Sequence, residues 1–117
     1  MSNVVKLNKK IRISYCLPEA ILVDVKSAMM SQGYDLKGKS KWITEAIHQL
    51  LSLPNYSDLV MINDQMDGFG KMDSISLDVT LKEKLDVAIL EIRKRHPIIE
   101  GVQSKILRTA IVQRLLR

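Results

Sequence analysis

Hydrophobic and polar residues alternate strictly in two short stretches of the chain. In residues 10–17 the apolar positions are Ile11, Ile13, Tyr15 and Leu17. In residues 74–81 they are Ile75, Leu77, Val79 and Leu81. A period of two is typical of a β-strand with one buried face. The pattern therefore predicts two short strands, over residues 11–17 and 75–81.

Apolar residues recur at helical spacing after each strand, so two amphipathic helices are expected to follow it. The first pair covers residues 18–32 and a stretch that begins at Ser40. The second pair runs from Thr80 to Pro97 and from Ser104 to the C-terminus. The order strand, helix, helix therefore occurs twice.

Several residues suit the ends of these helices. Pro18 fits a first helical turn, and Gly33 fits the position after a helix end. Ser40 and Ser104 are expected to cap the second helix of each unit, and Thr80 with Glu83 is expected to form a capping box.

The two units match at a constant offset of 64 residues. The segment SKWITEAI at residues 40–47 is followed by SKILRTAI at residues 104–111. Without a gap, residues 11–52 align with residues 75–116 at ten identical positions. Chance similarity of two amphipathic helices would explain the eight-residue match alone, but not a register that also aligns the strands.

This repeat predicts the organisation of the chain. We expect a flexible basic arm over residues 1–10, repeat 1 over 11–52, a linker over 53–72 and repeat 2 over 73–117. A unit of about 42 residues is too short to bury a core of its own, so the repeats should share one. Antiparallel pairing of the two strands would satisfy their backbone groups and leave a polar outer face. A mainly α fold with a two-stranded ribbon is therefore expected, and such a ribbon fits the major groove of DNA.

Composition narrows the functional classes. The net charge of +5 and a pI near 9.4 favour a polyanionic partner. Cys16 is the single cysteine, which fits a reducing compartment and excludes an internal disulfide. The residues form no catalytic set and no metal-ligand spacing, so neither enzymatic activity nor a cofactor is expected. No apolar run has the length of a membrane span, and a cytoplasmic location is predicted.

The first predicted strand ends in Leu17-Pro18-Glu19, the helix after it is closed by Gly33, and the next helix begins with SKWITEAI. These features resemble the ribbon-helix-helix family of the Arc, MetJ and CopG type. Most members dimerise to form the ribbon. The resemblance implies a tandem version here, in which both repeats form a pseudo-dimer within one chain. This organisation is similar to that of plasmid-borne regulators and of relaxosome accessory proteins.

The resemblance also implies the residues that contact DNA. Base-reading positions would be Arg12, Ser14 and Cys16 in the first strand, and Ser76, Asp78 and Thr80 in the second. Phosphate would be bound at the start of each second helix by Lys39, Ser40 and Lys41, and by Ser104 and Lys105. The arm residues Lys6, Lys9 and Lys10 either follow the DNA backbone or form a solvated tail.

Three residues leave alternatives open. Cys16 either contacts a thymine methyl group or is a small tolerated residue. Asp78 either accepts a hydrogen bond from cytosine or pairs with Arg12 across the ribbon. Trp42 is expected in the core, or at an interface between pseudo-dimers, rather than stacked on a base.

The leading functional hypothesis is a sequence-specific transcription regulator from a plasmid or another mobile element. A relaxosome accessory protein at a conjugative transfer origin is the first alternative, and an antitoxin-type autorepressor is the second. The partners expected are double-stranded DNA, further copies of the protein on adjacent sites, and a relaxase or RNA polymerase, but no membrane.

Overall fold

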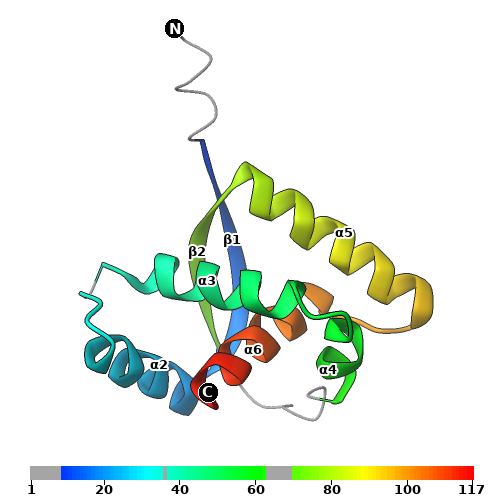
Figure 1. Cartoon of the computed structure of the whole chain (residues 1–117). Helices are drawn as coiled ribbons and strands as arrows, with labels where there is room; N and C mark the ends of the chain where they lie inside the picture. The colour runs from blue at the N-terminus through cyan, green and yellow to red at the C-terminus, as the bar shows by residue number, and fades with distance from the viewer. Residues whose placement is uncertain (1–8, 36, 63–69) are drawn as a thin grey trace, which may run out of the picture.

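The computed structural model describes residues 9–35, 37–62 and 70–117. In chain order the elements of these ranges are β1 (Lys10–Pro18), α2 (Glu19–Ser31), α3 (Lys39–Leu51), α4 (Tyr56–Ile62), β2 (Gly70–Asp78), α5 (Val79–Arg95) and α6 (Val102–Leu115). Figure 1 shows the two strands side by side, with the helices around them. The described chain is thus mainly helical with one two-stranded antiparallel sheet, and the predicted fold class is confirmed at this level.

The helices of the two halves follow the 64-residue offset. Adding 64 to the bounds of α2 gives 83–95, and α5 spans 79–95. Adding 64 to the bounds of α3 gives 103–115, and α6 spans 102–115. The helix ends therefore coincide, and α5 differs from α2 by one additional turn at its start.

The strand pairing is antiparallel and runs from Lys10 opposite Asp78 to Pro18 opposite Gly70. Ser14 lies opposite Ser74 at its centre, and Arg12 lies opposite Ser76; the latter two positions are 64 residues apart (76 − 12). The second strand was predicted over residues 75–81 but spans Gly70–Asp78, so the prediction lies too far toward the C-terminus. Lys10 is the first strand residue of β1 in the described chain, so residues beyond Asp78 have no strand to pair with.

The helix that follows β2 begins where this pairing ends. Asp78 is its N-cap, and its carboxylate accepts a hydrogen bond of 2.7 Å from the Leu81 N–H. The predicted capping box of Thr80 and Glu83 is wrong. Asp is a stronger N-cap than Thr, and it stands at the last paired residue of the ribbon.

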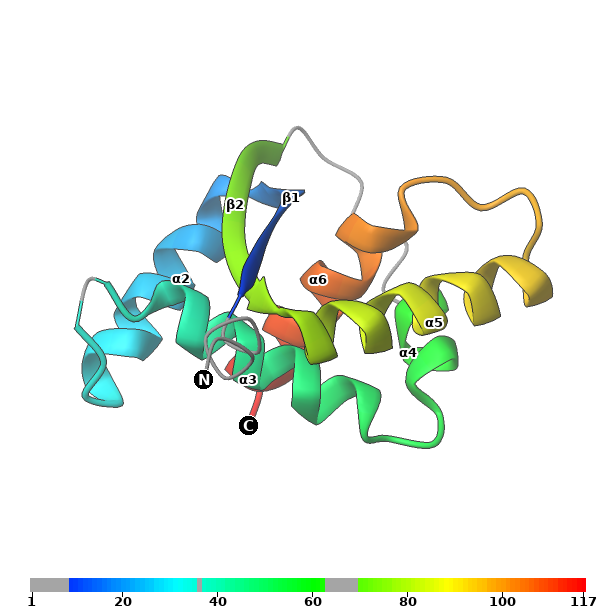
Figure 2. The ribbon, with the colours of Figure 1, turned by 90° about the horizontal axis from the view of Figure 1, so that it is seen from above.

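One core lies under the ribbon. Its members from the strands are Ile13, Tyr15, Leu17, Ile75 and Leu77, and they pack in a single cluster with buried residues of all five helices. Figures 1 and 2 show α3 and α6 against the same face of the ribbon. Trp42 on α3 is fully buried, which confirms its expected place in the core.

Gly33 ends α2 as predicted. Its φ of 85° lies in the left-handed region, and the Tyr34 N–H donates back to the Met29 carbonyl at 2.8 Å. The Gly33 N–H bonds the Met30 carbonyl at 3.2 Å, which completes a Schellman motif.

The stretch predicted as a linker is partly regular structure. It contains α4, whose Val60 is fully buried, and its last three residues, 70–72, belong to β2. Residues 63–69 lie outside the described ranges.

Candidate nucleic-acid interface

The outer face of the ribbon is the surface directed away from the core. It is formed by Lys10, Arg12, Ser14 and Cys16 of β1, and by Met72, Ser74, Ser76 and Asp78 of β2. Their alternation with buried residues on both strands follows the period of two. In the described ranges no helix lies across this face in Figure 2. The face is therefore open to a partner.

Arg12 and Ser76 form the second of the four cross-strand pairs on this face, next to Lys10 and Asp78. The Arg12 Nη1 is 3.5 Å from the Ser76 Oγ, a long contact that leaves the guanidinium exposed. Ser14 lies opposite Ser74 beside this pair. Four of the side chains around the centre can thus donate or accept hydrogen bonds toward a molecule in front of the ribbon.

Asp78 lies in the second strand as predicted, whereas Thr80 does not. Asp78 is on the outer face opposite Lys10, and its carboxylate caps α5, so the alternative in which it pairs with Arg12 is not what the structure shows. Thr80 lies in the first turn of α5, not in the ribbon. Its predicted place in the second strand is wrong because β2 ends two residues earlier.

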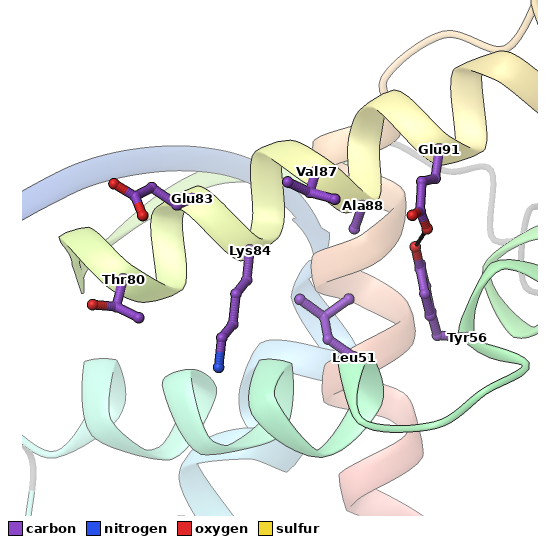
Figure 3. Close-up of a pocket in the computed structure, with 8 residues that line it drawn as sticks. All are labelled: Leu51, Tyr56, Thr80, Glu83, Lys84, Val87, Ala88 and Glu91. Atoms are coloured by element: carbon purple, nitrogen blue, oxygen red, sulfur yellow. Dashed lines mark hydrogen bonds between the residues drawn. The ribbon is translucent and has the colours of Figure 1, made fainter.

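Figure 3 shows where Thr80 lies instead, in a groove of about 430 Å³ between α5 and the end of α3. Leu51, Val87 and Ala88 form its apolar part. The Tyr56 hydroxyl donates to Glu91 at its far end, and partial burial together with this carboxylate raises the pKa of Tyr56 to about 12. None of the residues that line the groove belongs to the ribbon.

Met72 is an outer-face residue that the sequence did not indicate. It lies opposite Cys16, and the Cys16 Sγ is 3.1 Å from the Met72 Sδ. Met72 exposes 67% of its surface. It was missed because residues 70–72 resemble the Asp- and Gly-rich stretch before them. The alternation that begins at Ile75 could have been extended backward to place it outward.

The starts of α3 and α6 lie against the two edges of the ribbon. The Ser40 Oγ of α3 accepts a hydrogen bond of 3.3 Å from the Ser76 N–H of β2. The Ser104 Oγ of α6 accepts one of 3.1 Å from the Cys16 N–H of β1. Each helix therefore accepts a backbone hydrogen bond from the strand of the other repeat. These bonds lie on edges of the ribbon that would otherwise present unpaired backbone groups.

The edge of β1 receives further contacts from α6. The Gln103 side chain donates to the Ser14 carbonyl at 2.8 Å, and the Arg108 guanidinium donates to the Cys16 carbonyl at 3.3 Å. These bonds fix the first turns of α6 beside the outer face.

Ser40 and Ser104 are not the helix caps that the sequence predicted. The N-caps are Gly38 and Gly101, and each serine lies within the first turn, where its hydroxyl reaches the neighbouring strand. The helix starts are nevertheless beside the ribbon, where the N–H groups of a first helical turn and the helix dipole favour an anion.

Lys39 is held in an ion pair under the ribbon. Its Nζ lies 2.7 Å from Asp73 Oδ1, and the Tyr15 hydroxyl donates to Asp73 Oδ2 at 2.7 Å. Burial raises the pKa of the Asp73 carboxyl, but the bonds from Lys39, Tyr15 and the Ser74 N–H outweigh it and lower the pKa below its ordinary value. Burial and the nearby carboxylate raise the pKa of Tyr15. This pairing occupies a lysine that was expected to bind phosphate.

The other predicted basic residues differ in exposure. Lys41 is exposed near the start of α3, whereas Lys105 on α6 is partly buried. Lys9 is exposed, and Lys10 belongs to β1 instead of an arm. Lys6 lies outside the described residues.

Arg114 joins α6 to the first repeat. Its guanidinium donates to the Trp42 carbonyl at 2.6 Å and to the Tyr34 hydroxyl at 3.1 Å, and it lies 4.5 Å from the Trp42 ring centre. Only 11% of its side chain is exposed. This residue was not identified from the sequence, in which its counterpart 64 positions earlier is Leu50.

A search of the described residues for three or more His, Cys, Asp or Glu side chains able to hold a metal ion finds no such group. In the same ranges, no helix combines the length and apolar character needed to cross a membrane. Comparison with models of known protein families, with curated proteins and with solved structures finds no match to this chain.

Proposed function

We propose that this chain is a tandem ribbon-helix-helix protein that binds a specific sequence of double-stranded DNA with the outer face of its ribbon. The observation that carries the proposal is the pairing of Arg12 with Ser76. These residues occupy the same position in the two repeats, so an approximate two-fold axis passes between them. A ribbon made by two equivalent strands about such an axis is the arrangement that two chains of this family make when they dimerise.

The helix contacts support the same arrangement. Each second helix bonds to the strand of the other repeat, through Ser40 and Ser104. The two repeats are therefore interwoven around one core, as the halves of a pseudo-dimer would be.

The chemistry of the outer face suits the major groove. A two-stranded ribbon fits the width of this groove, and the exposed Arg12 guanidinium can donate two bonds to guanine O6 and N7. The net charge of +5 favours association with phosphate, and the starts of α3 and α6 flank the ribbon where the DNA backbone would pass. The biological role of this binding is the regulation of transcription.

The test starts with selection of random DNA duplexes on the intact protein, followed by affinity measurements on the enriched site. Arg12→Ala should lose about 1–3 kcal/mol of discrimination, roughly 10- to 100-fold, and keep most of its affinity for unrelated DNA. Arg93→Ala is the matched control because it removes an equal charge from an exposed site at the far end of α5.

A variant Arg12→Ala with unchanged sequence preference would show that the ribbon does not read the bases. Mapping the bound sites in the genome then separates the biological roles. Sites at promoters support transcription regulation, whereas sites next to a nick in a transfer origin would assign the protein to a relaxosome.

A further inference from the structure

The two ends of the outer face differ in chemistry. At one end lie Lys10 opposite Asp78 and, next to them, the exposed Arg12. At the other end Cys16 lies opposite Met72. Both are uncharged side chains that contain sulfur. The ribbon therefore changes from charged to apolar along its length, although its backbone pairing is regular.

Met72 is held on the outer face by the register of the sheet. Ile75 and Leu77 of the same strand are fully buried, so residues of the opposite parity point outward. The contact with Cys16 places the thioether beside the other strand, and most of its surface is open. A single exposed methionine is ordinary on a protein surface. Met72, however, lies on the same face of the ribbon as Arg12, which is the proposed DNA-reading face.

We propose that Met72, supported by Cys16, contacts the C5 methyl group of thymine, so that the ribbon reads a site with two chemically different ends. This inference rests on the proposed function. Thymine is the base whose major-groove edge carries a methyl group, and apolar side chains are the groups that contact it. A thioether is flexible and polarizable and adapts to such a contact. The helix starts that flank the ribbon with backbone N–H groups favour DNA over an apolar protein partner at this surface.

The spacing of the two contacts follows from the strand. Cys16 is four residues from Arg12, which corresponds to roughly 13 Å at about 3.3 Å per residue. Bases of one DNA strand are about 3.4 Å apart along the axis. The thymine contacted by Met72 should therefore lie about three to four base pairs from the guanine contacted by Arg12.

Replacing thymine by uracil tests the proposal because it removes the methyl group and leaves base pairing intact. Each thymine of the selected duplex is replaced singly, and affinity is measured for the wild-type protein and for Met72→Ala. We expect uracil at one or two positions, on one side of the site, to weaken the wild-type protein about four-fold for each methyl group. The Met72→Ala variant should bind the thymine and uracil duplexes equally.

Three controls make the result specific. Met30→Ala removes an equally exposed methionine (70%) from α2 and should retain the sensitivity to uracil. Met72→Leu keeps an apolar side chain and should also retain it. Arg12→Ala should relax the guanine preference at a separate position and leave the uracil effect unchanged.

The outcomes separate this inference from the proposed function. If a specific site is selected but no thymine in it responds to uracil, or if Met72→Ala responds as the wild type does, the methyl contact is refuted and specific DNA binding stands. If selection enriches no sequence, the proposed function and this inference fall together. Thermal unfolding of each variant verifies that the exposed substitutions leave the fold intact.

Discussion

Asp73→Asn should lower the stability of the protein and, at the same time, increase its affinity for DNA. The carboxylate of Asp73 accepts bonds from the Lys39 ammonium and the Tyr15 hydroxyl, both at 2.7 Å. Bonds to a charged group contribute about 1.5–3 kcal/mol, against about 0.5–1.5 kcal/mol for neutral pairs. An asparagine keeps one acceptor oxygen without the charge, so we expect a loss of about 1–2 kcal/mol in the free energy of unfolding.

The same substitution changes the charge beside the proposed DNA-binding face. The net charge rises from +5 to +6 (5 + 1), and Lys39 is released from its ion pair at the start of α3. The dependence of log affinity on log salt should steepen by up to about one unit, because one more lysine can neutralise a phosphate. Urea unfolding measures the first effect, and salt titrations of DNA binding measure the second. Asp24→Asn is the control, since it removes an equal charge from an exposed position on α2.

The pH dependence provides a further check on Asp73. Its pKa in the folded protein is lower than its ordinary value of 3.8, so its contribution to stability is present above pH 3.8 and is lost as the pH falls through the folded value. The difference in unfolding free energy between wild type and Asp73→Asn should therefore disappear at low pH. Equal stability of Asp73→Asn and Asp24→Asn at neutral pH would refute the network. A loss of stability without a steeper salt dependence would show that Lys39 does not face DNA.

Two further predictions concern α6 and α3. Arg114→Leu should lower the unfolding free energy by about 2–3 kcal/mol in urea titrations, because the Trp42 carbonyl and the Tyr34 hydroxyl lose a charged donor. As a control, Arg93→Leu at an exposed position should change the unfolding free energy by less than about 0.5 kcal/mol. Lys41→Ala should weaken binding to all DNA sequences alike and reduce the salt dependence by about one contact. The control Lys94→Ala, at the far end of α5, should have neither effect. A loss of affinity confined to one sequence would contradict a phosphate contact.

The hydrogen bonds at the edges of the ribbon could not be predicted from the sequence. The hydroxyls of Ser40 and Ser104 were expected to cap their own helices, because serine at a helix start usually does so. In the fold each accepts instead from an N–H of the neighbouring strand. Local preference cannot show this, since the competing donor comes from a segment 36 or 88 residues away.

The sequence by itself determined the periodic features of this protein. Alternation at Ile11 to Leu17 indicated a strand, the offset of 64 residues indicated that the helices would repeat, and Gly33 indicated where α2 ends. These features depend on residues close together in the chain, whose apolar spacing or backbone freedom selects one local structure. The helix ends that match across the two halves show how far such signals extend.

Only the tertiary structure decided which residues are available on the outer face of the ribbon and which are not. Where β2 ends depends on where β1 begins, and this places Thr80 in a helix and brings Met72 onto the outer face. Lys39 is paired because packing brings it to Asp73, which is 34 positions away. A strand needs a partner, and a partly buried carboxylate needs a donor, so both outcomes are set by contacts between distant segments.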